Sequence, residues 1–150
     1  MQCFAKSDRG AVRKENQDRA AGARIRRKGC VVGVVCDGMG GAAGGKLASE
    51  LAASTFLAQF RREMMPGSAV EPAMRAACDA ANQAVYGRAC ADPELRGMGT
   101  TIVAACVRHG RLTVLHVGDS RAYLIHNGEM TRITHDHSVV QTLVENGNIT

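Results

Sequence analysis

The residues best suited to do chemistry follow an apolar run of strand length. Asp37 comes directly after the run 30–36, and the glycine-rich segment 38–45 comes after it. A carboxylate in this position can hold a hard cation such as Mg²⁺ or Mn²⁺, while glycines let backbone carbonyls approach the ion closely. Water held by such an ion loses a proton near neutral pH and becomes a nucleophile. No histidine neighbours Asp37 in the sequence, which argues against zinc.

Two other interpretations of the glycine-rich segment are open. Residues 38–43 fit the G-x-G-x-x-G/A fingerprint of dinucleotide-binding proteins. That fold needs a second parallel strand soon after the helix, whereas another helix is expected here, and Asp37 would face a pyrophosphate. Residues 40–46 nearly complete a phosphate-binding P-loop, but Leu47 stands where that loop needs a hydroxyl for magnesium. Residue chemistry alone favours the metal interpretation without deciding it.

Hydrophobic periodicity predicts the elements that must position these residues. Strands are expected at 1–6, 30–36, 100–107, 111–117, 121–126 and 130–133, and helices at 44–65, 68–90 and 138–146. The continuous apolar run 30–36 predicts a strand buried on both faces, followed by a turn at 37–41. Ser68 with Glu71 predicts a capping box, and Asn127-Gly128 predicts a hairpin. Two helices followed by an antiparallel series of strands predict an α+β fold, not a doubly wound parallel sheet.

Length and composition narrow the class of protein. A chain of 150 residues suits one domain with a real core. Aromatic residues make up only 3%, which argues against a stacking platform for single-stranded nucleic acid. The net charge is +5, but the positive charges are scattered. Their densest run, 24–28, is expected to be a solvated loop, with a docking patch for acidic substrates as the alternative.

The cysteines suggest a reducing compartment. Six are present, none in a C-x-x-C pattern and none spaced with histidine as zinc ligands. Cys30 and Cys36 bracket an apolar strand, where a thiol acts as a small hydrophobe. The chain opens with no signal-like segment, and no apolar run approaches the length of a membrane span. We therefore expect a cytoplasmic protein that binds neither membrane nor nucleic acid.

Several separated motifs, taken together, resemble one protein family. They are Arg13-x-x-Asn16-Gln17-Asp18, Asp37-Gly38-Met39-Gly40-Gly41, Gly97-Met98-Gly99-Thr100-Thr101, Gly118-Asp119-Ser120-Arg121-Ala122-Tyr123 and Asp136-His137-Ser138. Their order and spacing resemble the metal-dependent protein phosphatases of type 2C, the PPM family, in its compact bacterial form. Each motif is weak alone, but the set is specific and spans essentially the whole chain. The resemblance implies a four-layer α-β-β-α sandwich, with two antiparallel sheets flanked by helices.

The resemblance also implies a role for individual residues. Asp37 would bridge two ions, Mg²⁺ or Mn²⁺, and Gly38 would give its backbone carbonyl to one of them. Asp18 would hold metal-bound water by a hydrogen bond. Arg13 would clamp two phosphate oxygens, because its planar guanidinium matches their geometry. Asp119 would help to hold a third, weaker metal, unless it only forms the turn after a strand.

Other polar residues near these motifs are expected to be structural. Thr100 and Thr101 should pack under the site, and Asn16 should shape the loop that carries Arg13 and Asp18. His135 and His137 resemble a metal-binding pair, but we expect them to belong to a structural loop.

The activity that the resemblance implies is hydrolysis of phosphoserine and phosphothreonine in proteins. Metal-bound hydroxide would attack phosphorus directly, with no covalent enzyme intermediate. The implied partners are phosphorylated signalling proteins and a cognate serine/threonine kinase. Two positions depart from the family pattern: Ala42, where histidine is common, and Lys46, where an acid is common. Neither is an expected metal ligand.

The chain is shorter than the family pattern. Family members continue for roughly another half-length, to two aspartates that complete the second metal's ligands. We therefore expect residues 1–150 to be one phosphatase domain truncated at its carboxyl end. Open strand edges would then favour self-association. The alternative is a non-catalytic, phosphoprotein-binding or regulatory remnant of the same fold.

Overall fold

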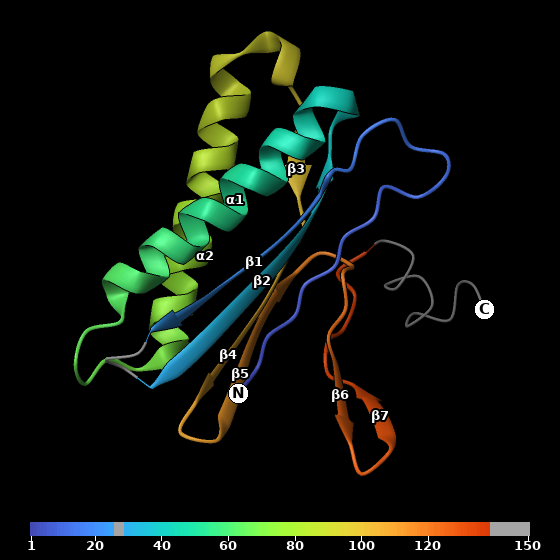
Figure 1. Cartoon of the computed structure of the whole chain (residues 1–150). Coiled ribbons are helices and arrows are strands. Elements are labelled where there is room, and N and C mark those ends of the chain that lie inside the picture. The colour runs from blue at the N-terminus through green and yellow to red at the C-terminus, as the bar shows by residue number, and fades with distance from the viewer. Residues whose placement is uncertain (26–28, 139–150) are drawn as a thin grey trace.

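The computed structural model describes residues 1–25 and 29–138 (Figure 1). Its elements are β1 (Asp18–Ile25), β2 (Cys30–Met39), α1 (Gly41–Glu63), α2 (Val70–Ala91), the 3₁₀ turn η2 (Pro93–Leu95), β3 (Gly99–Thr100), β4 (Ile102–Arg108), β5 (Arg111–Val117), β6 (Tyr123–His126) and β7 (Glu129–Arg132). Among these residues, no helix is both long and apolar enough to cross a membrane.

Two antiparallel sheets organise the described chain. The larger has the strand order β1-β2-β4-β5, and the short β3 pairs with the end of β2. Helices α1 and α2 lie side by side over one face of this sheet, and the β6-β7 hairpin stands on the other side (Figure 1). The predicted α+β class with two antiparallel sheets is confirmed.

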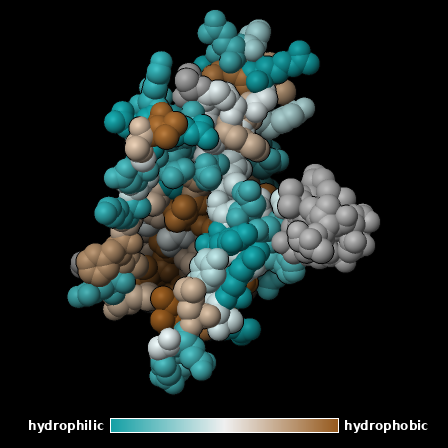
Figure 2. Space-filling model, turned by 90° about the vertical axis from the view of Figure 1, so that its right-hand side faces the viewer, coloured by the Kyte–Doolittle hydropathy of each residue, from teal (hydrophilic) through white to brown (hydrophobic). Residues whose placement is uncertain are grey.

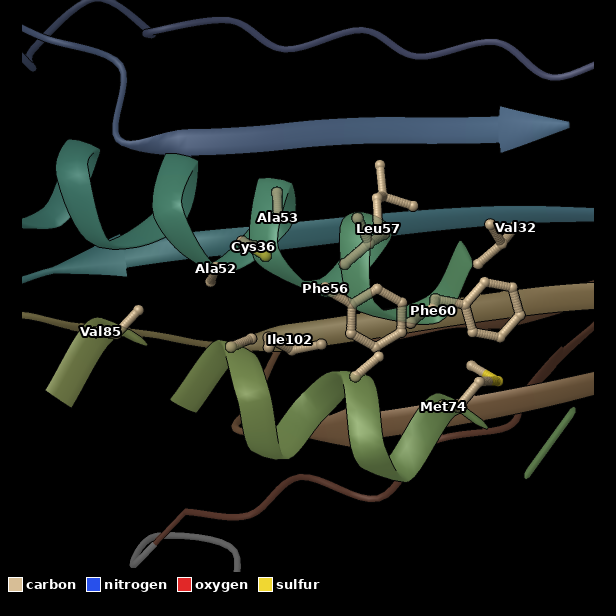
Figure 3. Close-up of a cluster of buried hydrophobic side chains, with 14 of the residues drawn as sticks. Val32, Cys36, Ala52, Ala53, Phe56, Leu57, Phe60, Met74, Val85 and Ile102 are labelled. Carbon is tan, nitrogen blue, oxygen red and sulfur yellow. The ribbon is translucent and has the colours of Figure 1, made fainter. Parts of the chain in front are cut away.

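The core lies between the larger sheet and the two helices. Alternate residues of β2 point toward the helices, and Val32, Val34 and Cys36 are almost fully buried there. Phe56 and Phe60 of α1 supply the aromatic part of this core, with parallel rings whose centroids lie 6.2 Å apart (Figure 3). Small side chains let the helices pack closely on each other and on the sheet; they are Ala48, Ala52, Ala53, Ala73, Ala77 and Ala81.

The other face of β2 contradicts the prediction of a strand buried on both sides. Val35 is 48% exposed and Met39 is 62% exposed, while their neighbours on the helix side are buried. Figure 2 shows hydrophobic side chains in a hollow on the side of the molecule that faces away from the helices. The apolar run is continuous because both faces carry valines, yet the described residues cover only one of them.

Strand β2 is also longer than predicted. It continues through Asp37 and Gly38 to Met39, where we expected a turn. The extension arises because β3 pairs with this end of the strand, matching Gly38 with Thr100. Gly40, with a φ of 116°, then turns the chain directly into α1.

The amino-terminal region differs from the prediction as well. Residues 1–6 form no strand, and β1 occupies 18–25, part of which we assigned to the basic loop 24–28. The composition of β1 hides it, because Ala and Gly are poor strand formers. Full-length pairing with β2 supplies its hydrogen bonds, and Ala21, Ala23 and Ile25 pack against the core.

One predicted helix start is wrong, and the predicted hairpin is present. The capping box was wrong: the Ser68 hydroxyl donates to the Glu63 carbonyl and accepts from the Met65 N–H, so it closes the end of α1 instead. The hairpin is confirmed, since Asn127 and Gly128 both have positive φ, 52° and 83°. The helix expected at 138–146 falls almost wholly outside the described residues.

Candidate active site

Strands β1 and β2 place two carboxylates side by side. Their register pairs Asp18 directly with Asp37. Because Cys36 points into the helix-covered core, Asp37 points to the opposite, open face of the sheet. Directly opposed residues have Cβ atoms about 5 Å apart, so the two acidic groups share one small site.

The electrostatics of Asp37 bring all four predicted charged residues together. Partial burial raises the pKa of Asp37, and the neighbouring Asp18 carboxylate raises it further. Asp119 acts in the same direction, whereas Arg13 lowers the pKa. The site therefore holds three acids and one arginine within electrostatic reach of each other.

This arrangement fits a hard cation. A divalent ion beside Asp37 would offset the repulsion that disfavours the ionised form of this carboxylate. Within residues 1–25 and 29–138, no set of three or more His, Cys, Asp or Glu side chains is arranged as a metal cage. The Asp37 carboxylate could instead hold a cation together with backbone carbonyls and water, as in many Mg²⁺ sites.

The glycines beside Asp37 are required by close packing of the chain on itself. A Cβ on Gly38 would lie 1.9 Å from the carbonyl oxygen of Gly45 in α1. A Cβ on Gly45 would lie 2.6 Å from Oε1 of Gln17. Only glycine lets the first turn of α1 approach the end of β2 so closely, and this approach fixes the backbone beside Asp37.

Two threonines hold the backbone of Asp37, as predicted. The Asp37 N–H donates to Oγ1 of Thr101 at 3.0 Å. The Asp37 carbonyl accepts from the Thr101 N–H and from the Thr100 hydroxyl, both at 2.9 Å. The Thr101 hydroxyl also lies 2.7 Å from that of Ser120, which follows Asp119 in the sequence. Thr101 thus connects β2 with the loop that carries Asp119.

The loop before β1 is shaped by Asn16 and Gln17. Asn16 accepts from the Asp18 N–H at 3.0 Å and donates to the Ser7 hydroxyl at 2.7 Å, which confirms its expected role. Gln17 was not singled out from the sequence. Its carbonyl accepts from the Gly38 N–H at 3.2 Å, and its side chain donates to the Gly41 carbonyl at 2.7 Å. Gln17 lies next to Asp18 in the motif Arg13-x-x-Asn16-Gln17-Asp18, and this position could have identified it as a residue of the site.

A pocket of about 650 Å³ opens over these residues. Arg13, Asp18, Asp37 and Gly38 line it together with neighbouring loop residues. Four of the five predicted site residues therefore share one pocket. Asp119 is not among its lining residues and reaches the site through its charge.

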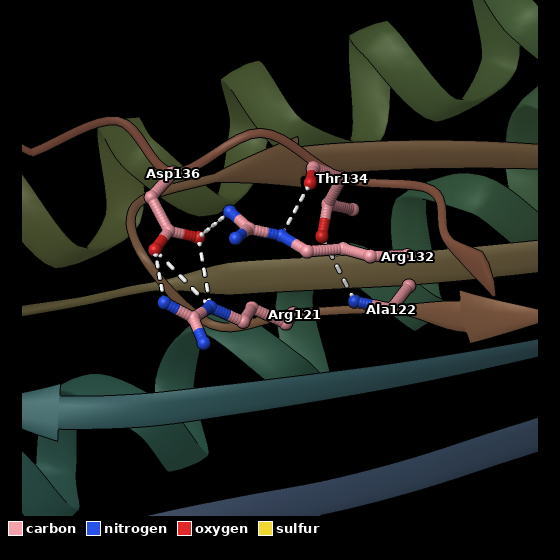
Figure 4. A network of polar contacts seen from close by, with 5 residues as sticks. All are labelled: Arg121, Ala122, Arg132, Thr134 and Asp136. Carbon is pink, nitrogen blue, oxygen red and sulfur yellow. Dashed lines mark hydrogen bonds and ion pairs between the residues drawn. The ribbon is translucent and has the colours of Figure 1, made fainter. Parts of the chain in front are cut away.

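An ionic network fastens the chain that follows Asp119 (Figure 4). Asp136 accepts from Nη2 of Arg121 at 2.7 Å and from Nη2 of Arg132 at 2.5 Å. The Arg121 guanidinium holds the pKa of Asp136 below its ordinary value. The Thr134 hydroxyl accepts from the Ala122 N–H at 2.9 Å, so the segment after β7 lies against the start of β6.

His137 has a structural role, as expected. Its N–H donates to the Gly118 carbonyl at 2.8 Å, and its ring centroid lies 4.5 Å from that of His116 on β5. These contacts hold the turn that precedes Asp119.

Solved structures with the same architecture are bacterial serine/threonine phosphatases. The chain matches the Mycobacterium tuberculosis serine/threonine phosphatase PstP/Ppp with a TM-score of 0.82 and 42% identity, covering 97% of this chain and 58% of that one. It matches the PstP catalytic domain in complex with two manganese ions equally well, covering 60% of that chain. Staphylococcus aureus Stp1 gives a TM-score of 0.86 at 34% identity, with 97% and 57% coverage. The fold is that of the PPM-type phosphatases.

The sequence comparisons identify the family. The chain is 43% identical over 147 residues to the serine/threonine protein phosphatase PstP of M. tuberculosis, covering 97% of this chain and 27% of that protein. It is 33% identical to the serine/threonine phosphatase stp of Listeria innocua, covering 99% and 60%. The family model of protein phosphatase 2C matches residues 9–143. The chain belongs to the protein phosphatase 2C family and spans 60% or less of the length of these relatives.

Proposed function

We propose that this chain carries the metal- and phosphate-binding residues of a protein serine/threonine phosphatase. The observation that supports this most directly is the pairing of Asp18 with Asp37, with Arg13 close enough to lower the pKa of Asp37. Acids that hold a cation and an arginine that holds phosphate are thereby brought to one pocket.

Each residue has a distinct task in this proposal. Asp37 would hold the cations with its carboxylate, and Gly38 would add its backbone carbonyl. When bound, Mg²⁺ or Mn²⁺ would activate water for attack on phosphorus. Asp18 would accept a hydrogen bond from that water and orient it. Arg13 would bind two phosphate oxygens and stabilise the charge that develops on them.

Two ions would occupy the complete site, and Asp119 would contribute to a weaker third one. Support for two ions comes from the manganese-bound PstP structure, which is that of a relative. We further propose phosphorylated serine/threonine proteins as substrates and a serine/threonine kinase as the opposing enzyme. The names of the relatives support this substrate class.

Substitution of Asp37 by asparagine tests the proposal, because it keeps the size of the side chain and removes its charge. In a protein that extends this chain to the complete phosphatase domain, Mn²⁺-dependent hydrolysis of p-nitrophenyl phosphate should fall at least tenfold, which is about 1.4 kcal/mol of barrier. Mn²⁺ binding measured by calorimetry should weaken in parallel, while the far-ultraviolet circular dichroism spectrum stays unchanged. Asp79→Asn is the matched control, since Asp79 is exposed on α2, away from the pocket.

Retention of more than about a tenth of the activity by Asp37→Asn would remove Asp37 from the metal site. Phosphopeptide binding without turnover in the unsubstituted chain would favour the non-catalytic alternative over the enzyme.

A further inference from the structure

A second pocket adjoins the candidate active site. It has a volume of about 460 Å³ and shares Arg9, Lys14, Glu15, Asn16 and Asp18 with the first pocket. Because the two pockets have common walls, a peptide seated in one would place its neighbouring residues in the other.

The second pocket is unusually basic. Its cationic lining residues are Lys6, Arg9, Lys14, Arg19 and Lys46, against three acids, Glu15, Asp18 and Glu50. Within the described parts of the chain, none of the five cations forms an ion pair. Arg121 and Arg132, by contrast, are both ion-paired with Asp136. With five cations and three acids, the lining of the pocket carries a net charge of +2. We call it the basic pocket.

Three parts of the fold build the basic pocket. Lys46 comes from the first turns of α1, Arg19 from β1, and the remaining cations from the loop before β1. The loop is held in shape, because Arg9 donates to the Lys14 carbonyl at 3.3 Å and Asn16 donates to Ser7. Side chains that are separated in the sequence therefore converge on one cavity.

We propose that the basic pocket binds acidic side chains that flank the phosphorylated residue of a protein substrate. This inference rests on the proposed phosphatase function and adds a preference among its substrates. Lys46 is central, because it is the lining cation that α1 brings to the pocket. Exposed charge pairs of this kind contribute modestly to binding and are weakened by salt. We therefore expect the preference for acidic substrates to appear as a modest difference in peptide affinity and in KM.

The lining argues against nucleic acid as the occupant. None of the described residues that line the basic pocket is aromatic, so these residues offer bases no ring to stack on. Glu15 and Glu50 would also repel a continuous phosphate backbone. A short acidic peptide, whose charges are separated by neutral residues, fits this mixed lining better.

Peptide binding to the 150-residue chain tests the inference without requiring turnover. Two fluorescein-labelled peptides are compared by fluorescence anisotropy: one phosphoserine flanked by glutamates, and the same sequence with glutamines. The glutamate peptide should bind more tightly, and Lys46→Glu should weaken its binding by roughly fivefold while changing the glutamine peptide by less than about twofold. The difference should shrink when salt rises from about 50 to 200 mM.

Arg62→Glu is the matched control. It makes the same change in net charge on the same helix, about 24 Å away along the axis of α1. It should leave the binding of both peptides within about twofold of the unsubstituted chain. Weaker binding of the glutamate peptide by Lys46→Glu would support the basic pocket, whether the protein is metal-free or loaded with manganese. This result does not require hydrolysis.

Three results would overturn the inference. The two peptides could bind equally well, or Arg62→Glu could weaken binding as much as Lys46→Glu, which would indicate attraction by net charge alone. A single-stranded oligonucleotide of equal charge that binds more tightly than the peptide, and depends on Lys46, would assign the pocket to nucleic acid.

Discussion

Replacement of Gly38 by alanine should destabilise the fold, because the added methyl group has no space. Its carbon would lie 1.9 Å from the carbonyl oxygen of Gly45 and 2.8 Å from that of Gln17. Both obstacles are backbone atoms, so α1 and β2 must separate by about 1 Å to relieve the overlap. Overpacking of this kind costs about 1–3 kcal/mol. The separation would also weaken the hydrogen bond from the Gly38 N–H to the Gln17 carbonyl, which adds about 1 kcal/mol.

Urea unfolding followed by far-ultraviolet circular dichroism measures this loss, since the chain has no tryptophan. The expected decrease in the free energy of unfolding is about 2–4 kcal/mol. Gly87→Ala is the control: Gly87 lies in α2 with nothing within 4 Å of an added Cβ, so alanine should stabilise by about 0.5–1 kcal/mol. If Gly38→Ala changes the free energy by less than about 0.5 kcal/mol while the control behaves as expected, the close approach of α1 to β2 is wrong.

Three further outcomes are expected. Arg13→Ala should raise the KM for a phosphopeptide by the equivalent of about 1.5–3 kcal/mol, with Mn²⁺ affinity in calorimetry nearly unchanged; equal losses would make Arg13 part of the metal site. Because Arg121 lowers the pKa of Asp136, the stability from this carboxylate is present above its ordinary pKa of 3.8 and is lost as pH falls through the lower native value. The difference in unfolding free energy between the unsubstituted chain and Asp136→Asn should therefore shrink between pH 6 and pH 3, and a constant difference would contradict this. Burial raises the pKa of Cys36 and Cys106 to about 12. Iodoacetamide at pH 8 should therefore label the exposed cysteines roughly a hundredfold faster than Cys36 and Cys106. Similar labelling rates for the two groups, measured by peptide mass spectrometry, would refute the burial argument.

The sequence predicted those elements whose local chemistry agrees with their final environment. Strand β5 was predicted at its observed bounds, because its residues favour strands and turn residues bracket it. The hairpin at Asn127-Gly128 was equally clear, since both residues tolerate positive φ. Helices α1 and α2 were found within three residues of their ends.

The errors in β1 and β2 share a physical cause, which is that pairing partners distant in the sequence override local composition. Strand β1 is rich in Ala and Gly and exists through its pairing with β2. The end of β2 stays extended because β3 pairs with it. Ser68 is a residue type that commonly starts helices, yet its hydroxyl donates to the Glu63 carbonyl at the end of α1. The strand pairings leave no local signal, whereas Ser68 bonds to residues only three and five positions before it.

For the candidate site, the motifs identified the charged residues and some of the residues that hold them in place, namely Asn16, Thr100 and Thr101. Asp18, Asp37 and Arg13 were all identified, and the structure brings them together. The same motifs contained Gln17 and Ser120, but their hydrogen bonds follow from the packing of α1 and of the loop after β5. A sequence pattern shows which residue types occur together, whereas these supporting contacts depend on the tertiary arrangement.

The register of β1 with β2 also limits how this sequence can change during evolution. Side chains alternate between the two faces of a strand, so one residue inserted within β1 would turn Asp18 from the open face toward the buried core. Two inserted residues would restore its face but move it roughly 6–7 Å along the strand, away from Asp37. Neither length change preserves the acidic pair, whereas the loop before residue 16 has no ladder to maintain. Homologous sequences that retain both aspartates and Arg13 should therefore vary in length before Arg13 and keep constant the length of β1 and of the segment that joins Arg13 to it.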